Sequence, residues 1–255
     1  MSERNLQITG SGNIIEGEYG FVKIMGDATA QGVVKAREIT IMGNATFHGD
    51  IEASKIVVHG NASFMKQVKT EYMKINGNLT VESDAIAMDL TVNGNSSIEK
   101  DLECGNVLIR GNYDSKGSVK GKNIKILGNL SCPGNITAEN IEVRGVIWCD
   151  GLMNGETITV YSYGKSYCKE IGASEVNILK PKFLATMFSF PRSKYFEADL
   201  VEGDVVNGQL LHAKEIHAQK VYLSKKCHVN RVEYTDTLEV ESSCVVEESV
   251  KIGEL

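Results

Sequence analysis

Two glycine-rich stretches near the start of the chain are candidates for nucleotide chemistry. Gly10 and Gly12 begin the spacing of a dinucleotide-binding loop, but Ile15 occupies the position of its third glycine. Gly12 and Gly17 have the spacing of a phosphate-binding loop, but Glu18 follows where that loop needs a lysine to contact phosphates. Neither stretch predicts a nucleotide site, and we expect no cofactor.

The histidines are the next group whose chemistry could include metal binding. None of the five stands with a cysteine or a carboxylate at a recognised ligand spacing, so we interpret them as solvated surface side chains and predict no metal site. They are His48, His59, His212, His217 and His228.

Three carboxylates recur at related positions. Asp50, Asp84 and Asp101 share one outward column with Gln67 and Ser118. A carboxylate pair for glycoside or lyase chemistry stays open, but like charges on a solvated face are the favoured interpretation. We therefore predict no catalytic residues and a protein that is not an enzyme.

Composition narrows the function further. The chain has 255 residues and a net charge of −6, which gives a phosphate backbone no positive surface and disfavours nucleic acid as a partner. It has no apolar run of about 18 residues, and its start lacks the apolar core of a signal peptide. We expect a cytoplasmic protein whose six cysteines are reduced.

The elements that would position any site follow a fixed repeat. Eight glycines recur with a constant 17-residue period: Gly26, Gly43, Gly60, Gly77, Gly94, Gly111, Gly128 and Gly145. The residues two and four positions before each glycine are apolar throughout, as in Ile41 and Ile39, and polar residues such as Thr40 separate them. Alternation with a period of two is typical of β-strands.

A 17-residue unit of two or three short strands leaves no room for a helix. Each unit is therefore predicted to be one coil of a β-solenoid, in which identical columns stack from coil to coil. Asparagine follows most of the glycines, as in Asn61 and Asn78. We predict that each glycine–asparagine corner uses positive φ and that the stacked amides hydrogen-bond to one another. The Asn-x-Ser/Thr triplets also match a glycosylation acceptor, but the structural interpretation is favoured.

The repeat changes after Val160. Residues 181–197 are bounded by proline and rich in aromatic residues, and their apolar spacing predicts a short amphipathic helix. A 17-residue spacing then returns, and an 18-residue spacing would align Val232 with Val250 and Tyr234 with Ile252. The predicted divisions are an N-terminal segment (1–21), a β-helix of 17-residue coils (22–180), the aromatic insertion (181–197) and additional β-helix coils (198–255). These last coils either continue the stack or form a short second one, and continuation is favoured.

The stacked cysteines admit two interpretations. Cys132 with Cys149, and Cys227 with Cys244, would occupy matching positions in adjacent coils, close enough for a disulfide. Other residues in the first of these columns are large and apolar, as Phe47 is. We favour small core side chains over disulfide bonds.

Residues 41–53 resemble the coil of the bactofilin family. Their pattern is Ile-x-Gly-Asn-Ala-x-Phe-x-Gly-Asp-Ile-x-Ala. Residues 5–12 and 232–234 resemble the long form found in Bacillus-type bacteria. The resemblance covers nearly the whole chain. It implies a right-handed parallel β-helix with a triangular apolar interior, in a bacterial cytoskeletal protein that polymerises without nucleotide. The coils after residue 197 and the aromatic insertion depart from the short family members.

The open ends of a solenoid suggest where subunits would join. Each end exposes unpaired strand edges and a slice of core unless a cap covers it. We predict end-to-end docking with further copies of the chain, and a related paralogue is an open second partner. The alternative is that residues 1–20 fold over one end. The candidate polymerisation residues are Leu6, Ile8, Val22, Ile24, Val246, Val250 and Ile252.

The aromatic insertion is a candidate contact for a membrane surface or a partner. Lysines and arginine flank its apolar side chains, as in helices that lie on an anionic bilayer; a helix packed on the solenoid is equally favoured. A membrane contact would place the protein at the inner face of the cell membrane. The candidate residues are Lys182, Phe183, Leu184, Met187, Phe188, Phe190 and Arg192.

Other functions fit the pattern less well. A hexapeptide-repeat acyltransferase would need a six-residue aliphatic period, which a 17-residue coil does not match. An ice- or carbohydrate-binding surface along the column from Thr29 to Ser97 is interrupted by Asp114 and Trp148. The main alternative to a filament is a β-helical scaffold that binds a protein partner and does not polymerise.

Overall fold

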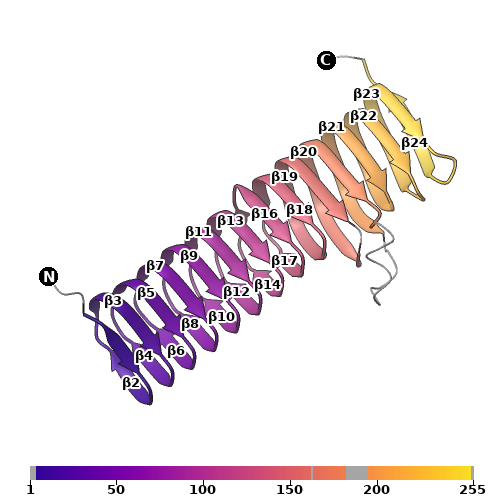
Figure 1. The fold of residues 1–255 in the computed structure, drawn as a ribbon. Coiled ribbons are helices and arrows are strands. Elements are labelled where there is room, and N and C mark those ends of the chain that lie inside the picture. Colours follow the sequence, from indigo (N-terminus) through magenta and orange to yellow (C-terminus); the bar gives the residue numbers. More distant parts are fainter. Residues whose placement is uncertain (1–3, 162, 182–194, 254–255) are drawn as a thin grey trace. The chain divides into compact units, whose positions relative to one another are not determined.

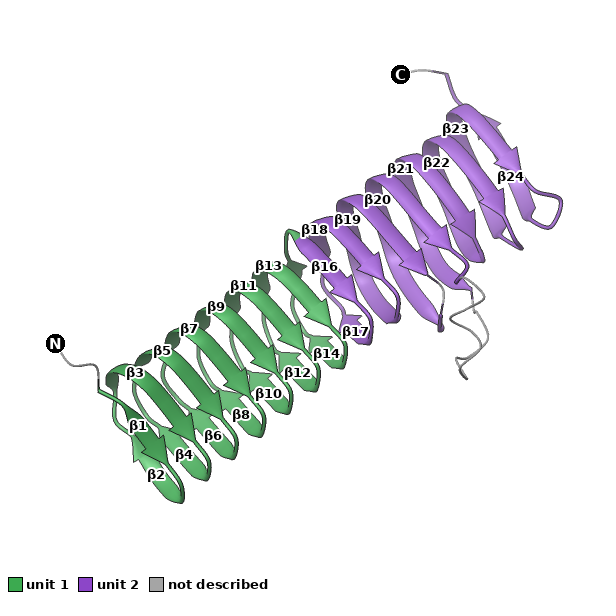
Figure 2. Ribbon diagram, viewed as in Figure 1, with its two compact units in different colours: residues 1–122 green, residues 123–255 purple. Residues whose placement is uncertain are grey.

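Every regular element that the structure describes is a β-strand (Figure 1). The computed structural model describes residues 4–161, 163–181 and 195–253. The chain divides into two compact units, residues 1–122 and 123–255 (Figure 2). Each unit is a parallel β-solenoid, which confirms the predicted all-β fold class.

Unit 1 alternates long and short strands. Its strands are β1 (Leu6–Ile8), β2 (Ser11–Ile14), β3 (Gly17–Ile24), β4 (Asp27–Ala30), β5 (Val34–Ile41), β6 (Asn44–Phe47), β7 (Ile51–Val58), β8 (Asn61–Phe64), β9 (Val68–Ile75), β10 (Asn78–Val81), β11 (Ala85–Val92), β12 (Asn95–Ile98), β13 (Leu102–Ile109), β14 (Asn112–Ser115) and β15 (Val119–Lys120).

Unit 2 begins with the same lengths and then has longer strands. Its strands are β16 (Asn123–Ile126), β17 (Asn129–Cys132), β18 (Ile136–Val143), β19 (Val146–Tyr161), β20 (Ser166–Leu179), β21 (Phe196–Gln209), β22 (Leu211–Ser224), β23 (His228–Val240) and β24 (Val245–Lys251).

The predicted stacking of columns is confirmed in unit 1. β5 pairs in parallel with β7 so that Ile39 lies against Ile56, its counterpart in the next coil. β6 pairs with β8 in the same way, with Phe47 against Phe64. The inward column that contains Ile41 and Ile75 has no exposed surface at these residues. The core is thus a set of apolar columns that run from coil to coil.

The repeated glycines have a different cause from the one predicted. Gly17 is the one glycine with positive φ among the described residues, and it lies outside the 17-residue series. A Cβ atom built on Gly77 would instead lie within 3.0 Å of the carbonyl oxygens of Gly60 and His59, in the preceding coil. Side chains are therefore excluded because adjacent backbones approach closely at this corner.

The predicted asparagine ladder is present in unit 1. Asn78 Nδ2 donates to Asn61 Oδ1 at 2.8 Å, and Asn95 Nδ2 donates to Asn78 Oδ1 at 2.9 Å. The ladder begins at Asp27, whose carboxylate accepts from Asn44 Nδ2 at 2.8 Å. These amides join successive coils, which supports the structural interpretation of the Asn-x-Ser/Thr triplets.

We expect Asn78→Ala to lower the free energy of unfolding by about 1–2 kcal/mol, because it removes both of these exposed hydrogen bonds. Thermal unfolding followed by circular dichroism measures the change. Lys66→Ala, at an exposed bend of the same unit, is the matched control and should change stability by less than about 0.5 kcal/mol. Equal effects of the two substitutions would mean that the ladder contributes nothing to stability.

Coil length varies in unit 2. β20 pairs with β21, so that Val176 lies against Val206, and β21 pairs with β22, so that Val206 lies against Val221. The coil from Val176 to Val206 is therefore much longer than the coil from Val206 to Val221. Positive φ occurs at Leu210, between β21 and β22, and at Lys225 and Lys226, between β22 and β23. The strands that follow the aromatic insertion therefore stack on β20 within this unit, and they run parallel to it, as continued coils would.

The predicted helix at 181–197 is not seen. Residues 182–194 lie outside the described part of the chain, so most of the segment cannot be compared with the prediction. The prediction is wrong for the last two residues of the segment, because Phe196 and Glu197 already belong to β21. Phe196 is fully buried in the apolar core, which explains why the strand begins there.

Candidate assembly and binding surfaces

The last coil of unit 2 leaves apolar side chains partly exposed. Leu238 and Val240 follow Val221 and Leu223 in two inward columns. Leu238 is half-buried and Val240 is 41% exposed, whereas Val221 and Leu223 are buried. Val246, in the inward column of Val229, is also half-buried. The candidate polymerisation residues include Val246 but not Leu238 and Val240, although the 17-residue spacing already aligns these two with Val221 and Leu223.

The last strand of unit 2 has a free edge. β24 pairs in parallel with β23, and no other strand of unit 2 pairs with it among the described residues (Figure 1). The peptide groups of β24 that point away from β23 are therefore open to a further strand.

The register of β24 corrects the predicted 18-residue spacing. Val232 pairs with Ser249 and Glu233 pairs with Val250, so the 17-residue spacing holds here as well. A shift of one residue moves a side chain to the opposite face of a strand. Val250 therefore lies in the column of Glu233, which forms ion pairs on the surface, rather than in the inward column of Val232.

Ile252 continues the same strand beyond its last paired residue. Its backbone N–H donates to the carbonyl of Tyr234 at 2.8 Å, but the residue aligned with Tyr234 is Lys251, not Ile252 as the 18-residue spacing predicted. Both Val250 and Ile252 are half-buried. They belong to the last coil, at its flank rather than in its core.

The first coil of unit 1 exposes less of its core. Leu6 pairs with Val22 and Ile8 with Ile24, so Val22 and Ile24 lie one coil inward and are buried. Ile8 is itself buried, and only Leu6 of these four is half-exposed. Residues 6–14 form β1 and β2 of this coil, rather than a separate cap.

A second feature of the first coil is the contact around Tyr19. The Tyr19 hydroxyl donates to the carbonyl of Ile15 at 2.5 Å, and the guanidinium of Arg4 lies 5.3 Å from the centre of the Tyr19 ring. These contacts hold the start of the chain against the coil, while β1 and β2 each pair on one side, with β3 and β4.

All of the residues proposed to contact a membrane or partner fall between 182 and 192. They lie outside the described residues, so their arrangement stays a prediction. In the part of the chain that the structure describes, no helix is long and apolar enough to cross a membrane.

The aspartates considered for catalysis have a structural contact instead. Asp50 Oδ1 accepts from the backbone N–H of Gln67 at 3.2 Å, and Asp101 Oδ1 accepts from Ser118 at 2.8 Å. Asp84 makes the same bond to Asp101. Each carboxylate thus joins a turn to the turn of the next coil, which gives the column a structural role.

The cysteines are all free thiols, as favoured over disulfide bonds. Cys132 pairs with Cys149, and both are fully buried. Burial raises the pKa of Cys227 to about 12, which makes its thiolate rare at neutral pH. Cys244 is half-buried in the last coil, where its Sγ accepts from the backbone N–H of Cys227 at 3.3 Å.

The histidines divide between exposed and clustered positions. His48 and His59 are exposed on unit 1. His217 lies 3.3 Å from a carboxylate oxygen of Glu215 and 3.6 Å from one of Glu202. No group of three or more histidine, cysteine or acidic side chains suited to a metal was found among the described residues.

The two remaining histidines belong to an aromatic row that sequence reasoning missed. Trp148 pairs with Tyr167, and Tyr167 pairs with Glu197 in the next coil. Glu197 is followed in the same column by His212 and then His228. The interval along the chain differs at every step of this column, so no constant period could reveal it.

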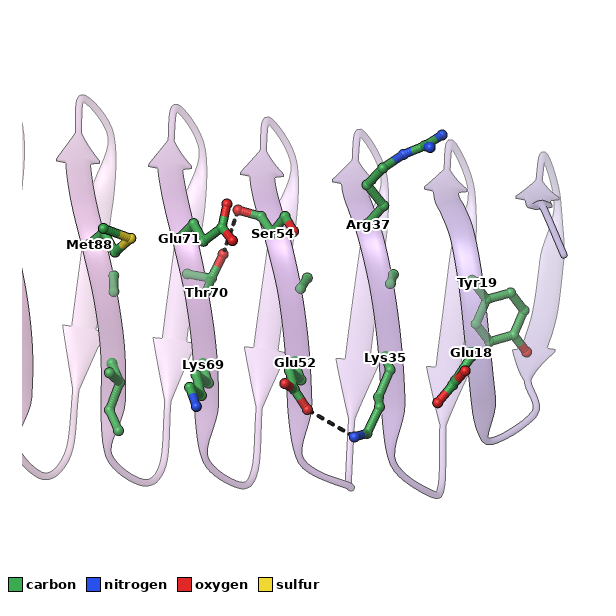
Figure 3. A pocket seen from close by; sticks show the side chains of 14 residues that line it. Glu18, Tyr19, Lys35, Arg37, Glu52, Ser54, Lys69, Thr70, Glu71 and Met88 are labelled. Atoms are coloured by element: carbon green, nitrogen blue, oxygen red, sulfur yellow. Dashed lines mark hydrogen bonds and ion pairs between the residues drawn. The ribbon is translucent and has the colours of Figure 1, made fainter. Parts of the chain in front are cut away.

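A shallow groove of about 520 Å³ crosses β3, β5, β7, β9 and β11 of unit 1 (Figure 3). Its floor is formed by small side chains such as Ala53 and Thr70. Acidic and basic residues alternate along one side, as Figure 3 shows: Glu18, Lys35, Glu52 and Lys69. Lys35 Nζ lies 3.0 Å from Glu52 Oε2, and this pairing lowers the pKa of Glu52.

These features define the class as a parallel β-solenoid protein with a partly exposed core at its last coil. Comparisons with protein-family models, with curated proteins and with solved structures found no match to this chain.

Proposed function

We propose that the protein is a structural component that joins end to end into filaments without nucleotide. The observation that carries this proposal is the last coil of unit 2. There Leu238, Val240 and Val246 are incompletely covered beside the free edge of β24. A second copy docked on this coil would bury the apolar side chains and pair with the strand edge at once.

A filament also needs a contact at the first coil. There β1 and β2 each pair on one side, and Leu6 is half-buried. A filament forms when the last coil of one copy docks on the first coil of the next. It also forms when first coils dock on first coils and last coils dock on last coils in alternation. The proposal therefore requires strand pairing at both ends, with most of the apolar area contributed by the last coil.

The resemblance to bactofilins supports the same function. It implies a right-handed β-helix and a bacterial cytoskeletal role, such as scaffolding cell-envelope, shape or motility processes at the membrane. The partner is a further copy of this chain, with a related paralogue as an open second partner. The expected location is cytoplasmic, at the inner face of the cell membrane.

We expect the purified protein to form filaments visible by negative-stain electron microscopy without nucleotide, and to sediment at high speed. Val240→Asp should leave the protein in the supernatant, because it places a charge in the apolar contact. Val33→Asp is the matched control, since Val33 is 42% exposed in unit 1 and lies in neither the first nor the last coil. It should sediment like the wild type.

The thiol of Cys244 gives an independent measurement of docking at the last coil. Its alkylation should slow as the protein concentration rises and filaments form, and it should stay fast in Val240→Asp. A wild-type protein that elutes as one discrete oligomer at every concentration would contradict filament formation.

The alternative function is a β-helical scaffold that binds a protein partner and does not polymerise. The groove of unit 1 favours it, because small floor residues beside a row of charged side chains leave room for an extended segment (Figure 3). The sedimentation experiment separates the two functions, since a scaffold of this kind stays in the supernatant at all concentrations.

A further inference from the structure

The aromatic row of unit 2 forms one side of an open hollow. The hollow has a volume of about 280 Å³ and is lined by residues that include Tyr167, His212 and His228. The rings of Trp148 and Tyr167 lie 5.0 Å apart at an angle of 42°, and His212 stacks on Tyr195 at 3.7 Å. Aromatic rings thus follow the coils across this face.

Trp148 has an uncovered ring surface. Its indole N–H donates to Asp150 Oδ1 at 2.9 Å, so its polar atom is already satisfied, yet the residue is 45% exposed. Tyr167 covers it on one side, whereas Ser131, its neighbour in the preceding coil, is too short to cover the other. An exposed indole held in place by a hydrogen bond is suited to stacking against a ligand.

A polar column runs beside the aromatic row. Asp199 and Asn230 line the hollow two residues beyond Glu197 and His228 in their strands. Asp199 forms an ion pair with Lys214 at 2.9 Å, and Glu197 lies 3.9 Å from Lys165. Since these carboxylates have cationic partners, the face provides hydrogen-bonding groups without a strong excess of either charge.

These two columns match the surface of a neutral sugar chain. The C–H face of a pyranose ring carries partial positive charge and packs on the negative face of an aromatic ring, while its hydroxyl groups need donors and acceptors at the side. We propose that the face from Trp148 to His228 binds a linear, uncharged oligosaccharide that lies along the solenoid. Adjacent coils lie about 4.8 Å apart, and the row of rings continues along the coils with one interruption, Glu197, between Tyr167 and His212. A row of this kind suits a polymer over a single small molecule.

The chain contains one tryptophan, so its emission reports directly on this site. Cellohexaose, N-acetylchitohexaose and maltohexaose are the probes, each titrated into the full-length protein. We expect a saturable shift of the emission to shorter wavelength with at least one of them, because a stacked sugar displaces water from the exposed indole. No saturable change with any of the three would overturn the proposal.

Variants then test the geometry. Tyr167→Ala should weaken binding roughly three- to tenfold, the range expected for losing one aromatic contact, whereas Tyr167→Phe keeps the ring and should bind like the wild type. Tyr222→Ala is the matched control, since Tyr222 lies in a different column of β22, between Asn207 and Glu239. Equal weakening by Tyr167→Ala and Tyr222→Ala would contradict the site.

Two further measurements test the folding of the variants and the charge of the ligand. Thermal unfolding of Tyr167→Ala should match that of the wild type, which excludes misfolding as the cause of a loss, and Trp148→Phe, titrated by calorimetry, should retain weaker binding. Oligolysine is the probe for a cationic ligand held by the rings and carboxylates. A stronger emission change with oligolysine than with all three sugars would overturn the assignment of a neutral ligand.

Discussion

Gly77→Ala should destabilise unit 1 by about 3–5 kcal/mol, although alanine adds one methyl group. The new Cβ would lie within 3.0 Å of two backbone carbonyl oxygens of the preceding coil, at Gly60 and His59. A backbone oxygen cannot move aside as a flexible side chain can, so the two coils must separate. Separation weakens the N–H to carbonyl bond from Asn78 to Gly60, which is 2.9 Å long.

Thermal unfolding measures this effect, with an expected decrease in Tm of roughly 10 °C. Gly10→Ala is the matched control, because a Cβ atom there would have no neighbour within 4 Å. Its Tm should match that of the wild type to within about 2 °C. Similar losses in the two variants would show that chain flexibility, not the approach of adjacent coils, explains the glycines.

Phe64→Ala should cost about 3–5 kcal/mol by opening a cavity in the core of unit 1. Phe64 has no exposed surface, and its ring packs edge-on against Phe47 with centroids 5.3 Å apart. Coils above and below fix the backbone, so the site has little freedom to collapse around the missing ring. Phe21→Ala, at a position that is 37% exposed, is the control and should cost about 1 kcal/mol or less.

Hydrogen exchange can locate the damage as well as its size. In a solenoid each coil contacts its neighbours, so loss of protection should concentrate in β6, β8 and β10. Equal protection of all strands in Phe64→Ala and Phe21→Ala would contradict a continuous stacked core at this column. A decrease spread evenly over unit 1 would instead show that its coils unfold as one cooperative block.

Part of the fold follows from spacing alone. A constant 17-residue interval places Ile39 on Ile56 and Phe47 on Phe64, because identical coils stack identical positions. Two-residue alternation within each strand then separates the core from the surface. The amide ladder at Asn61 and Asn78 was predictable on the same grounds.

Other features of the fold depend on turns whose length and conformation follow no repeated pattern in the sequence. The two coils joined to β21 differ in length. Positive φ occurs at Leu210 and Lys225, and neither leucine nor lysine is a residue type that indicates positive φ in a sequence. A register shift between Ala218 and Lys220 further changes the alignment of β22 with β23. The one-residue error at Val250 has another cause, because the residue that lies in the inward column of Val232 is the polar Ser249 and not an apolar residue.

The sequence by itself determined the class of fold, the coil length over most of unit 1 and the residues that form its core, since a repeated side-chain pattern can be buried in only one way. The tertiary structure decided which atoms meet where the period fails. It brought Trp148, Tyr167 and His212 into one row across unequal intervals, and it left Leu238 and Val240 partly uncovered in the last coil. Contacts between columns depend on turn geometry, and turn geometry is set by backbone packing that residue types alone do not specify.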